Sequence, residues 1–241
     1  MAHLAIVYHS GYGHTARVAE HVRLGATSVD GVSASLMAVD RIDWQALNDA
    51  DAIILGAPTY MGSVSAPFKT FMDQTSRQWL GQEWKDKLAS GFTNSGGLSG
   101  DKLSVLFQLQ LFSAQHGMLW VPFPLMPTGT GPDDLNRMGS HLGLMTQSDN
   151  APAEITPPAG DIRTAELFGI HVAERALARF AWPGYSFFIR IRQRLWKAPS
   201  TGMAMSSTSG KTSWSIGRKS RSVALPSHWS STGGGPTTVA G

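Results

Sequence analysis

The chain has 241 residues, of which 42% are hydrophobic and 15% are charged, and it contains no cysteine. A chain of this length can bury one good-sized hydrophobic core or two small ones. The lack of cysteine excludes disulfides, zinc–thiolate sites and thiol nucleophiles, so any redox chemistry needs a bound cofactor to carry the electrons.

The net charge of +3 combines two regions of opposite sign. Residues 183–241 carry eight basic residues and no acidic one, whereas residues 1–182 carry 12 basic and 17 acidic residues, a net charge of −5. The basic character therefore belongs to the tail and gives no reason to expect nucleic-acid binding by the folded part. We expect one folded domain over residues 1–182.

The tail, residues 183–241, differs from the domain in composition. Ser, Thr, Gly and Pro dominate residues 198–241, which predicts disorder. Residues 185–196 (YSFFIRIRQRLW) are apolar and basic. They are either an amphipathic arm that touches a membrane or another subunit, or part of an extension without function.

The first ten residues run straight into a predicted strand, without the basic stretch of a secretory signal, and no apolar run is long enough to span a bilayer. We therefore expect a cytoplasmic protein without stable membrane insertion.

Strand-like and helix-like segments alternate along the domain. In chain order, the pattern predicts strand 3–8, helix 15–26, strand 32–38, strand 51–56, helix 65–78, strand 88–93, helix 102–115, strand 118–121 and helix 162–180. Pro67 falls in the first turn of the second helix, where proline is tolerated. Five strands with intervening helices indicate a doubly wound α/β sheet.

Three small, polar, Gly-rich loops follow strands of this sheet: residues 10–15 (SGYGHT), 57–65 (APTYMGSVS) and 93–102 (TNSGGLSGDK). Doubly wound sheets bind ligands beyond the carboxyl ends of their strands. The first loop leads into a helix N-terminus, where unpaired N–H groups and the helix dipole favour an anion. It lacks the lysine of a Walker A loop, so it suits the single phosphate of a mononucleotide, although an ordinary tight turn has a similar composition.

These segments resemble the flavodoxin-like proteins, and in particular the WrbA-type NAD(P)H:quinone oxidoreductases and NADPH-dependent FMN reductases. Four segments carry the resemblance: GAPTYMG at 56–62, DQT at 73–75 with Trp79, the third loop at 93–100, and HGM at 116–118. It covers residues 3 to about 180 and implies a five-stranded parallel sheet in the order 2-1-3-4-5 with helices on both faces. Residues 123–158 match less well, since GSHLGLMTQS stands where the family has an aromatic–glycine segment that closes over the site.

The resemblance implies FMN as the cofactor, with NADH or NADPH as electron donor. The FMN phosphate would be held by Ser10, Tyr12, Gly13, His14 and Thr15. One side of the isoalloxazine would be lined by Pro58, Thr59, Tyr60, Met61, Gly62 and Ser63. The third loop would pass the ring edge and offer backbone N–H groups, with cofactor-binding residues Thr93, Asn94, Ser95, Gly96, Gly97, Leu98 and Gly100.

Two further residues gain roles from the resemblance. His116 would stand near the open face of the flavin as the catalytic residue, and Trp79 would lie at the interface of a dimer or tetramer, because neighbouring chains help to enclose the site in this family. From the residues alone, His116 can equally cap a helix end, Trp79 can be a core residue and Tyr60 a plain loop aromatic. No metal site is expected, since His9 and His14 lack carboxylate partners at useful spacing.

We predict an FMN-dependent oxidoreductase that passes two electrons from NAD(P)H to a quinone-like acceptor by a ping-pong mechanism. One alternative is a flavodoxin-type electron carrier with no small-molecule substrate of its own. Such carriers dock redox partners through strongly acidic surfaces, and the small net charge of this domain argues against that alternative. The other alternative is a flavodoxin-fold module that no longer binds flavin and works through protein contacts. The intact phosphate loop argues against this alternative.

Overall fold

The computed structural model describes residues 1–181, and the predicted disordered tail and basic arm lie outside this range. In chain order the elements are β1 (Ala2–Tyr8), α1 (His14–Thr27), β2 (Val32–Ala38), α2 (Trp44–Asp49), β3 (Ala52–Tyr60), β4 (Ser63–Val64), α3 (Ala66–Gln74), α4 (Ser76–Gly81), β5 (Leu88–Ser95), α5 (Lys102–Gln115), β6 (Leu119–Trp120), β7 (Leu144–Gln147) and α6 (Ala159–Ala181). Over these residues, no helix has both the length and the apolar character needed to cross a membrane.

The central sheet has the strand order β2-β1-β3-β5-β6, and these strands are parallel. The predicted doubly wound, flavodoxin-like order 2-1-3-4-5 is therefore confirmed, with β5 and β6 as its fourth and fifth strands. The central strands β1 and β3 read as near-continuous apolar runs because helices cover both of their faces.

The fifth strand differs from the prediction of one segment at 118–121. It is divided into β6, which pairs with the beginning of β5 at Leu88↔Leu119, and β7, which pairs with its end at Phe92↔Leu144. The chain leaves the sheet edge between the two pieces, over residues 121–143. Strand β7 was not predicted, because only two of its four side chains, Leu144 and Thr146, are buried.

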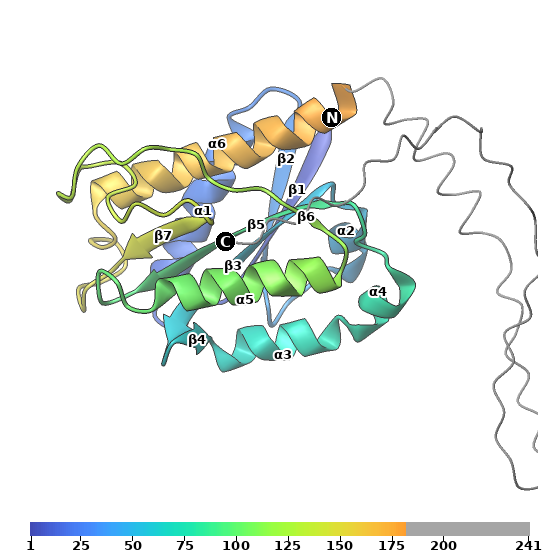
Figure 1. Cartoon of the computed structure of the whole chain (residues 1–241), viewed down its shortest axis with the longest axis horizontal. Helices are drawn as coiled ribbons and strands as arrows, with labels where there is room; N and C mark the ends of the chain where they lie inside the picture. Colours follow the sequence, from blue (N-terminus) through green and yellow to red (C-terminus); the bar gives the residue numbers. More distant parts are fainter. Residues whose placement is uncertain (182–241) are drawn as a thin grey trace, which may run out of the picture. The chain divides into compact units, whose positions relative to one another are not determined.

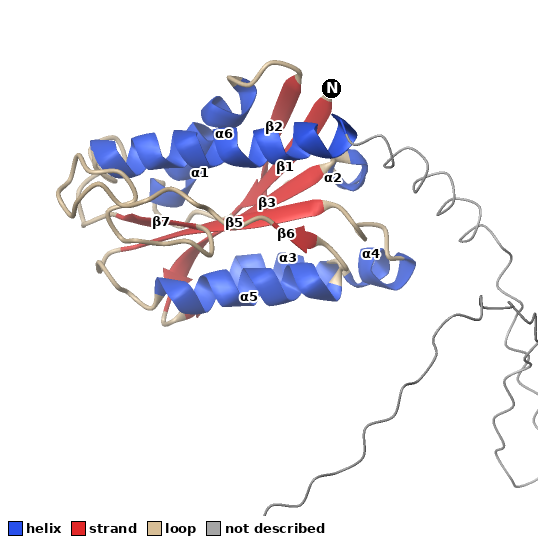
Figure 2. Ribbon diagram, turned by 45° about the horizontal axis from the view of Figure 1, so that its top comes forward, coloured by secondary structure: helices blue, strands red, loops and turns tan. Residues whose placement is uncertain are grey.

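Helices α1 and α6 cover one face of the sheet, and α3 and α5 cover the other (Figures 1 and 2). Glycines allow α1 and α6 to approach closely. A Cβ atom on Gly25 would overlap the Glu166 carbonyl of α6, and one on Gly169 would overlap the Val22 carbonyl of α1. Each helix thus places a glycine against the backbone of the other, which fixes where α1, and the loop before it, sits on the sheet.

The predicted helix at 65–78 is in fact two helices, α3 and α4, with Thr75 between them. The Thr75 hydroxyl donates to the Met72 carbonyl at 2.7 Å, and this local bond competes with helix continuation. Pro67 lies in the first turn of α3, as predicted. Sequence analysis also missed α2, which has only six residues, and the short strand β4.

Candidate functional site

The three Gly-rich loops meet at one edge of the sheet, because they follow the neighbouring strands β1, β3 and β5 at their carboxyl ends. The rings of Tyr12 and Tyr60, from the first and second loops, meet edge to face at 6.3 Å. The Thr59 and Thr93 hydroxyls, from the second and third, are 2.8 Å apart. The predicted cofactor residues of all three loops therefore form one cluster, the loop site.

The first loop forms an open helix N-terminus. Gly13 adopts a φ of 90°, which favours glycine, and α1 begins at the next residue. The Gly13 N–H donates to the Ser10 hydroxyl at 3.1 Å, which narrows the loop. Within residues 1–181 no side chain caps the helix, which leaves its first N–H groups available to an anion.

Residues 149–153 lie against this loop. The His14 ring contacts the Ala151 carbonyl at 2.9 Å through Nε2, and Arg17 donates to the Ala153 carbonyl at 2.6 Å. His14, predicted as a phosphate ligand, thus also anchors this neighbouring segment. Sequence analysis missed Arg17, and its only signal was a basic residue in the first turn of α1, where the helix dipole disfavours a cation.

The second loop is a tight hairpin between β3 and β4, paired at Tyr60↔Ser63. Met61 and Gly62 form its turn with positive φ values of 50° and 76°, as two-residue hairpins require. Met61 is fully exposed at the tip, while Tyr60 folds back over Gly11. Partial burial and nearby Tyr12 raise the pKa of the Tyr60 hydroxyl.

The third loop is anchored at its start by buried hydrogen bonds to Thr146 and Ser148, which lie in and just after β7. Thr93 and Asn94 are buried, and the Asn94 side-chain oxygen accepts hydrogen bonds from Thr146 at 2.8 Å and Ser148 at 3.0 Å. Gly96, Gly97 and Leu98 are exposed above them. At the loop's end, Gly100 and Asp101 both have a φ of 53° and turn the chain into α5.

A buried charged cluster lies beneath the third loop and was not predicted. Arg137 and Asp161 form an ion pair at 2.8 Å with side-chain exposures of 7% and 2%. Lys102 is completely buried beside them, and desolvation lowers its pKa to about 8, against the opposing effect of Asp161. Its signal in the sequence was a lysine at the first position of a helix, where a cation opposes the helix dipole.

His116 and Trp79 lie elsewhere. His116 ends α5 and precedes β6, which pairs with the start of β5, so it lies at the amino-terminal edge of the sheet, opposite the loop site. It is 2% exposed, packs on Trp84 at 4.5 Å, and contacts the Thr75 hydroxyl at 2.9 Å through Nε2. Burial lowers its pKa to about 4, and its Nδ1 has no partner among the described residues. Trp79 is 47% exposed on α4.

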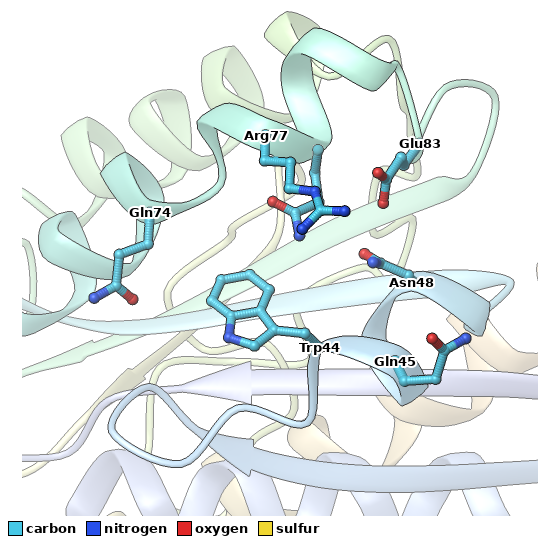
Figure 3. Close-up of a pocket in the computed structure, with 7 residues that line it drawn as sticks. Trp44, Gln45, Asn48, Gln74, Arg77 and Glu83 are labelled. Atoms are coloured by element: carbon cyan, nitrogen blue, oxygen red, sulfur yellow. The ribbon is translucent and has the colours of Figure 1, made fainter.

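Two hollows open away from the loop site. One, of about 580 Å³, lies between α2 and the α3–α4 segment, where Trp44 and Asn48 face Gln74, Arg77 and Glu83 (Figure 3). The other, of about 230 Å³, is lined by Thr75, Trp79 and His116 among others. Neither includes a residue of the three loops.

The parallel sheet, its strand order and the helices on both of its faces define a flavodoxin-like protein. Comparison with known proteins agrees with this class. Residues 44–131 match the model of the NADPH-dependent FMN reductase family. The chain is similar to flavodoxin FldP of Pseudomonas aeruginosa, with 40% identity over 182 residues, which cover 72% of this chain and 96% of that protein.

It is also similar to an NAD(P)H dehydrogenase (quinone) of Syntrophobacter fumaroxidans, at 30% identity over 71% of this chain and 95% of that protein. Among solved structures, a flavodoxin, WrbA-like protein from Agrobacterium tumefaciens has 41% identity and a TM-score of 0.60, covering 74% of this chain and 99% of that chain. The chain belongs to the flavodoxin-like WrbA and FMN reductase family.

Proposed function

We propose that this protein is an FMN-dependent oxidoreductase that takes two electrons from NAD(P)H at the loop site and passes them to a quinone-like acceptor. FMN as cofactor and NAD(P)H as electron donor follow from the family. When bound, FMN supplies the exchange of two electrons, and the protein supplies binding, orientation and electrostatics.

The main support for FMN binding comes from the unpaired backbone N–H groups of the third loop. The N–H groups of Gly96, Gly97 and Leu98 donate no hydrogen bond within the described residues. Packing among residues 1–181 does not require glycine at 97, since a Cβ atom there would meet the Gly100 backbone at an ordinary contact distance of 3.6 Å. Gly96 has similar room, with Ser148 O as its nearest neighbour at 3.6 Å. Free donors and a bare backbone on the outer side fit a flat ligand that lies against the loop.

The other loops fit the rest of the same cofactor. The uncapped N-terminus of α1 and the Ser10 hydroxyl can bind the single phosphate of a mononucleotide. Tyr12, Tyr60 and the exposed Met61 can cover a planar ring and exclude water from it. We therefore assign the cofactor-binding role to the loop site as a whole.

His116 has a narrower place in this proposal. Its position at the opposite edge of the sheet means that it can reach a flavin only from a second copy of the chain. With a lowered pKa it is neutral at pH 7, so it can accept a proton or a hydrogen bond but carries no positive charge. The proposed catalytic role of His116 therefore requires an oligomer, and we propose it together with the ping-pong order of the two substrates.

A flavodoxin-type electron carrier is the second candidate, because flavodoxin FldP is similar over most of its length. The net charge of −5 over residues 1–182 is small for a protein that docks redox partners through an acidic surface. The NAD(P)H dehydrogenase (quinone) relatives support the enzyme.

Anaerobic mixing of the FMN-loaded protein with NADH and, separately, NADPH separates the two functions. Rapid loss of the flavin absorbance, with colour restored by benzoquinone, is the result expected of the oxidoreductase and identifies the preferred donor. Flavin that dithionite bleaches but neither nucleotide reduces would make the protein an electron carrier.

A further inference from the structure

Lys102 is a buried cation whose position needs an explanation. It is completely buried, and it occupies the first position of α5, where the helix dipole opposes positive charge. Burial of a lysine is tolerated only where its ammonium group finds partners. Here the partners are two carbonyls of the third loop, Gly97 O and Leu98 O, the latter at 3.1 Å.

These bonds fix the direction of the loop backbone. Gln147 donates to the Gly96 carbonyl at 2.7 Å, so three consecutive carbonyls, those of residues 96–98, are held inward by Lys102 and Gln147. The N–H groups of the same three residues have no acceptor within the described residues. Inward carbonyls and free N–H groups on successive residues make a surface suited to negative charge.

The cluster behind the loop carries a net positive charge. Asp161 is already paired with Arg137 through two hydrogen bonds, at 2.8 and 3.2 Å, and it accepts a third from the Gln147 N–H at 2.8 Å. Arg137 also donates to the Gln147 side chain at 2.8 Å. One carboxylate therefore faces two cations, and the surplus charge lies under the exposed donors of the loop.

We propose that Lys102 is the positioning residue of the third loop and that its buried charge makes the site bind reduced FMN in preference to oxidised FMN. The inference rests on FMN binding at the loop site as proposed above. Reduction adds negative charge to the ring system, and a fixed cation in a low-dielectric surrounding stabilises that charge more than an exposed one would.

The test compares Lys102→Met and Lys102→Gln in the full-length, FMN-loaded protein. Fluorescence titration gives the dissociation constant of oxidised FMN, and a dithionite redox titration gives the ratio of reduced to oxidised dissociation constants. Lys102→Met should raise this ratio tenfold or more, which is about 30 mV for a two-electron couple. Lys102→Gln, which keeps a donor for one loop carbonyl, should bind oxidised FMN within about threefold of wild type yet show the same change in ratio.

Lys87→Met is the matched control. Lys87 also donates to two backbone carbonyls, those of Asn48 and Ala50, but at the opposite edge of the sheet. Its loss should destabilise the apoprotein without changing the ratio.

The pH dependence provides a signature that a merely structural lysine would lack. The pKa of Lys102 is about 8, and among the described residues the charged groups that act on it are Arg137 and Asp161. The difference in ratio between wild type and Lys102→Gln should therefore shrink between pH 7 and pH 10. A ratio within twofold of wild type in both Lys102 variants would overturn the proposal. Chemical reduction keeps this test separate from the question of NAD(P)H, since a flavin that neither nucleotide reduces still gives a ratio.

Discussion

Neutralising Asp161 should be the most damaging single change among the polar contacts that support the third loop. Asp161→Asn preserves the volume of the side chain but leaves the Arg137 guanidinium, 7% exposed, without its counter-charge. Breaking a buried ion pair by removing one charge costs about 3–5 kcal/mol. Asp161 also accepts the Gln147 N–H at 2.8 Å in the first turn of α6, where an acidic residue is favoured, so the upper half of that range is expected.

Urea unfolding of the apoprotein, followed by circular dichroism, measures this loss as a fall in the free energy of unfolding. Asp73→Asn is the matched control, since Asp73 also pairs with a cation, Lys69, at 2.6 Å, but there both side chains are more than half exposed. An exposed pair contributes at most about 1 kcal/mol. If Asp161→Asn and Asp73→Asn lower the free energy of unfolding equally, Asp161 and Arg137 do not contribute as a buried ion pair.

Four further substitutions test other parts of the structure. Gly97→Ala should leave the unfolding free energy of the apoprotein within about 0.5 kcal/mol of wild type, yet it should weaken FMN binding, measured by titration, at least tenfold. Gly100→Ala should also destabilise the apoprotein by about 1–3 kcal/mol, because Gly100 has a φ of 53° and the added methyl group would overlap Ser95 Oγ. Equal FMN affinity of wild type and Gly97→Ala would contradict the placement of the ligand. Gly169→Ala should cost about 2 kcal/mol or more, because the added methyl group meets the Val22 carbonyl of α1, and a thermal melt unchanged from wild type would count against this close helix contact. His116, with a pKa of about 4 in the folded state against 6.5 when unfolded, stabilises the fold fully above about pH 6.5 and loses on the order of 3 kcal/mol as the pH falls to 4. His116→Gln should therefore flatten the pH dependence of apoprotein unfolding in that window, and an unchanged slope would refute the assignment.

The sheet could be predicted from the sequence because its central parallel strands β1, β3 and β5 are buried on both faces. Each of the first four predicted strands matches an observed one in place and order, since an apolar run bounded by Gly or Pro has few alternatives. The fifth was found only in part. Once the chain leaves the sheet after β6 and returns at β7, neither piece is long enough to show a period.

The loops were predictable for a different reason. Few residue types adopt the positive φ that Gly13, Gly62 and Gly100 have, so these glycines indicate the turns of the loops in the sequence itself. The cluster beneath the third loop leaves no such trace. Lys102, Arg137 and Asp161 are far apart in the chain, and only the folded structure shows that three charged residues, ordinarily exposed, share one buried place.

Helix α5 joins the two halves of the proposed chemistry. It begins at Lys102, under the third loop, and ends beside His116, which is about 20 Å away along a helix of 14 residues. The cofactor loops and the His116–Trp79 region therefore lie at opposite edges of one sheet. A single copy can bind FMN and exchange electrons, as a carrier does, without using the second edge. In the proposed function, the amino-terminal edge gains a role in catalysis only where another copy brings it over the loop site, so we expect the difference between carrier and oxidoreductase to depend on assembly as well as on the fold.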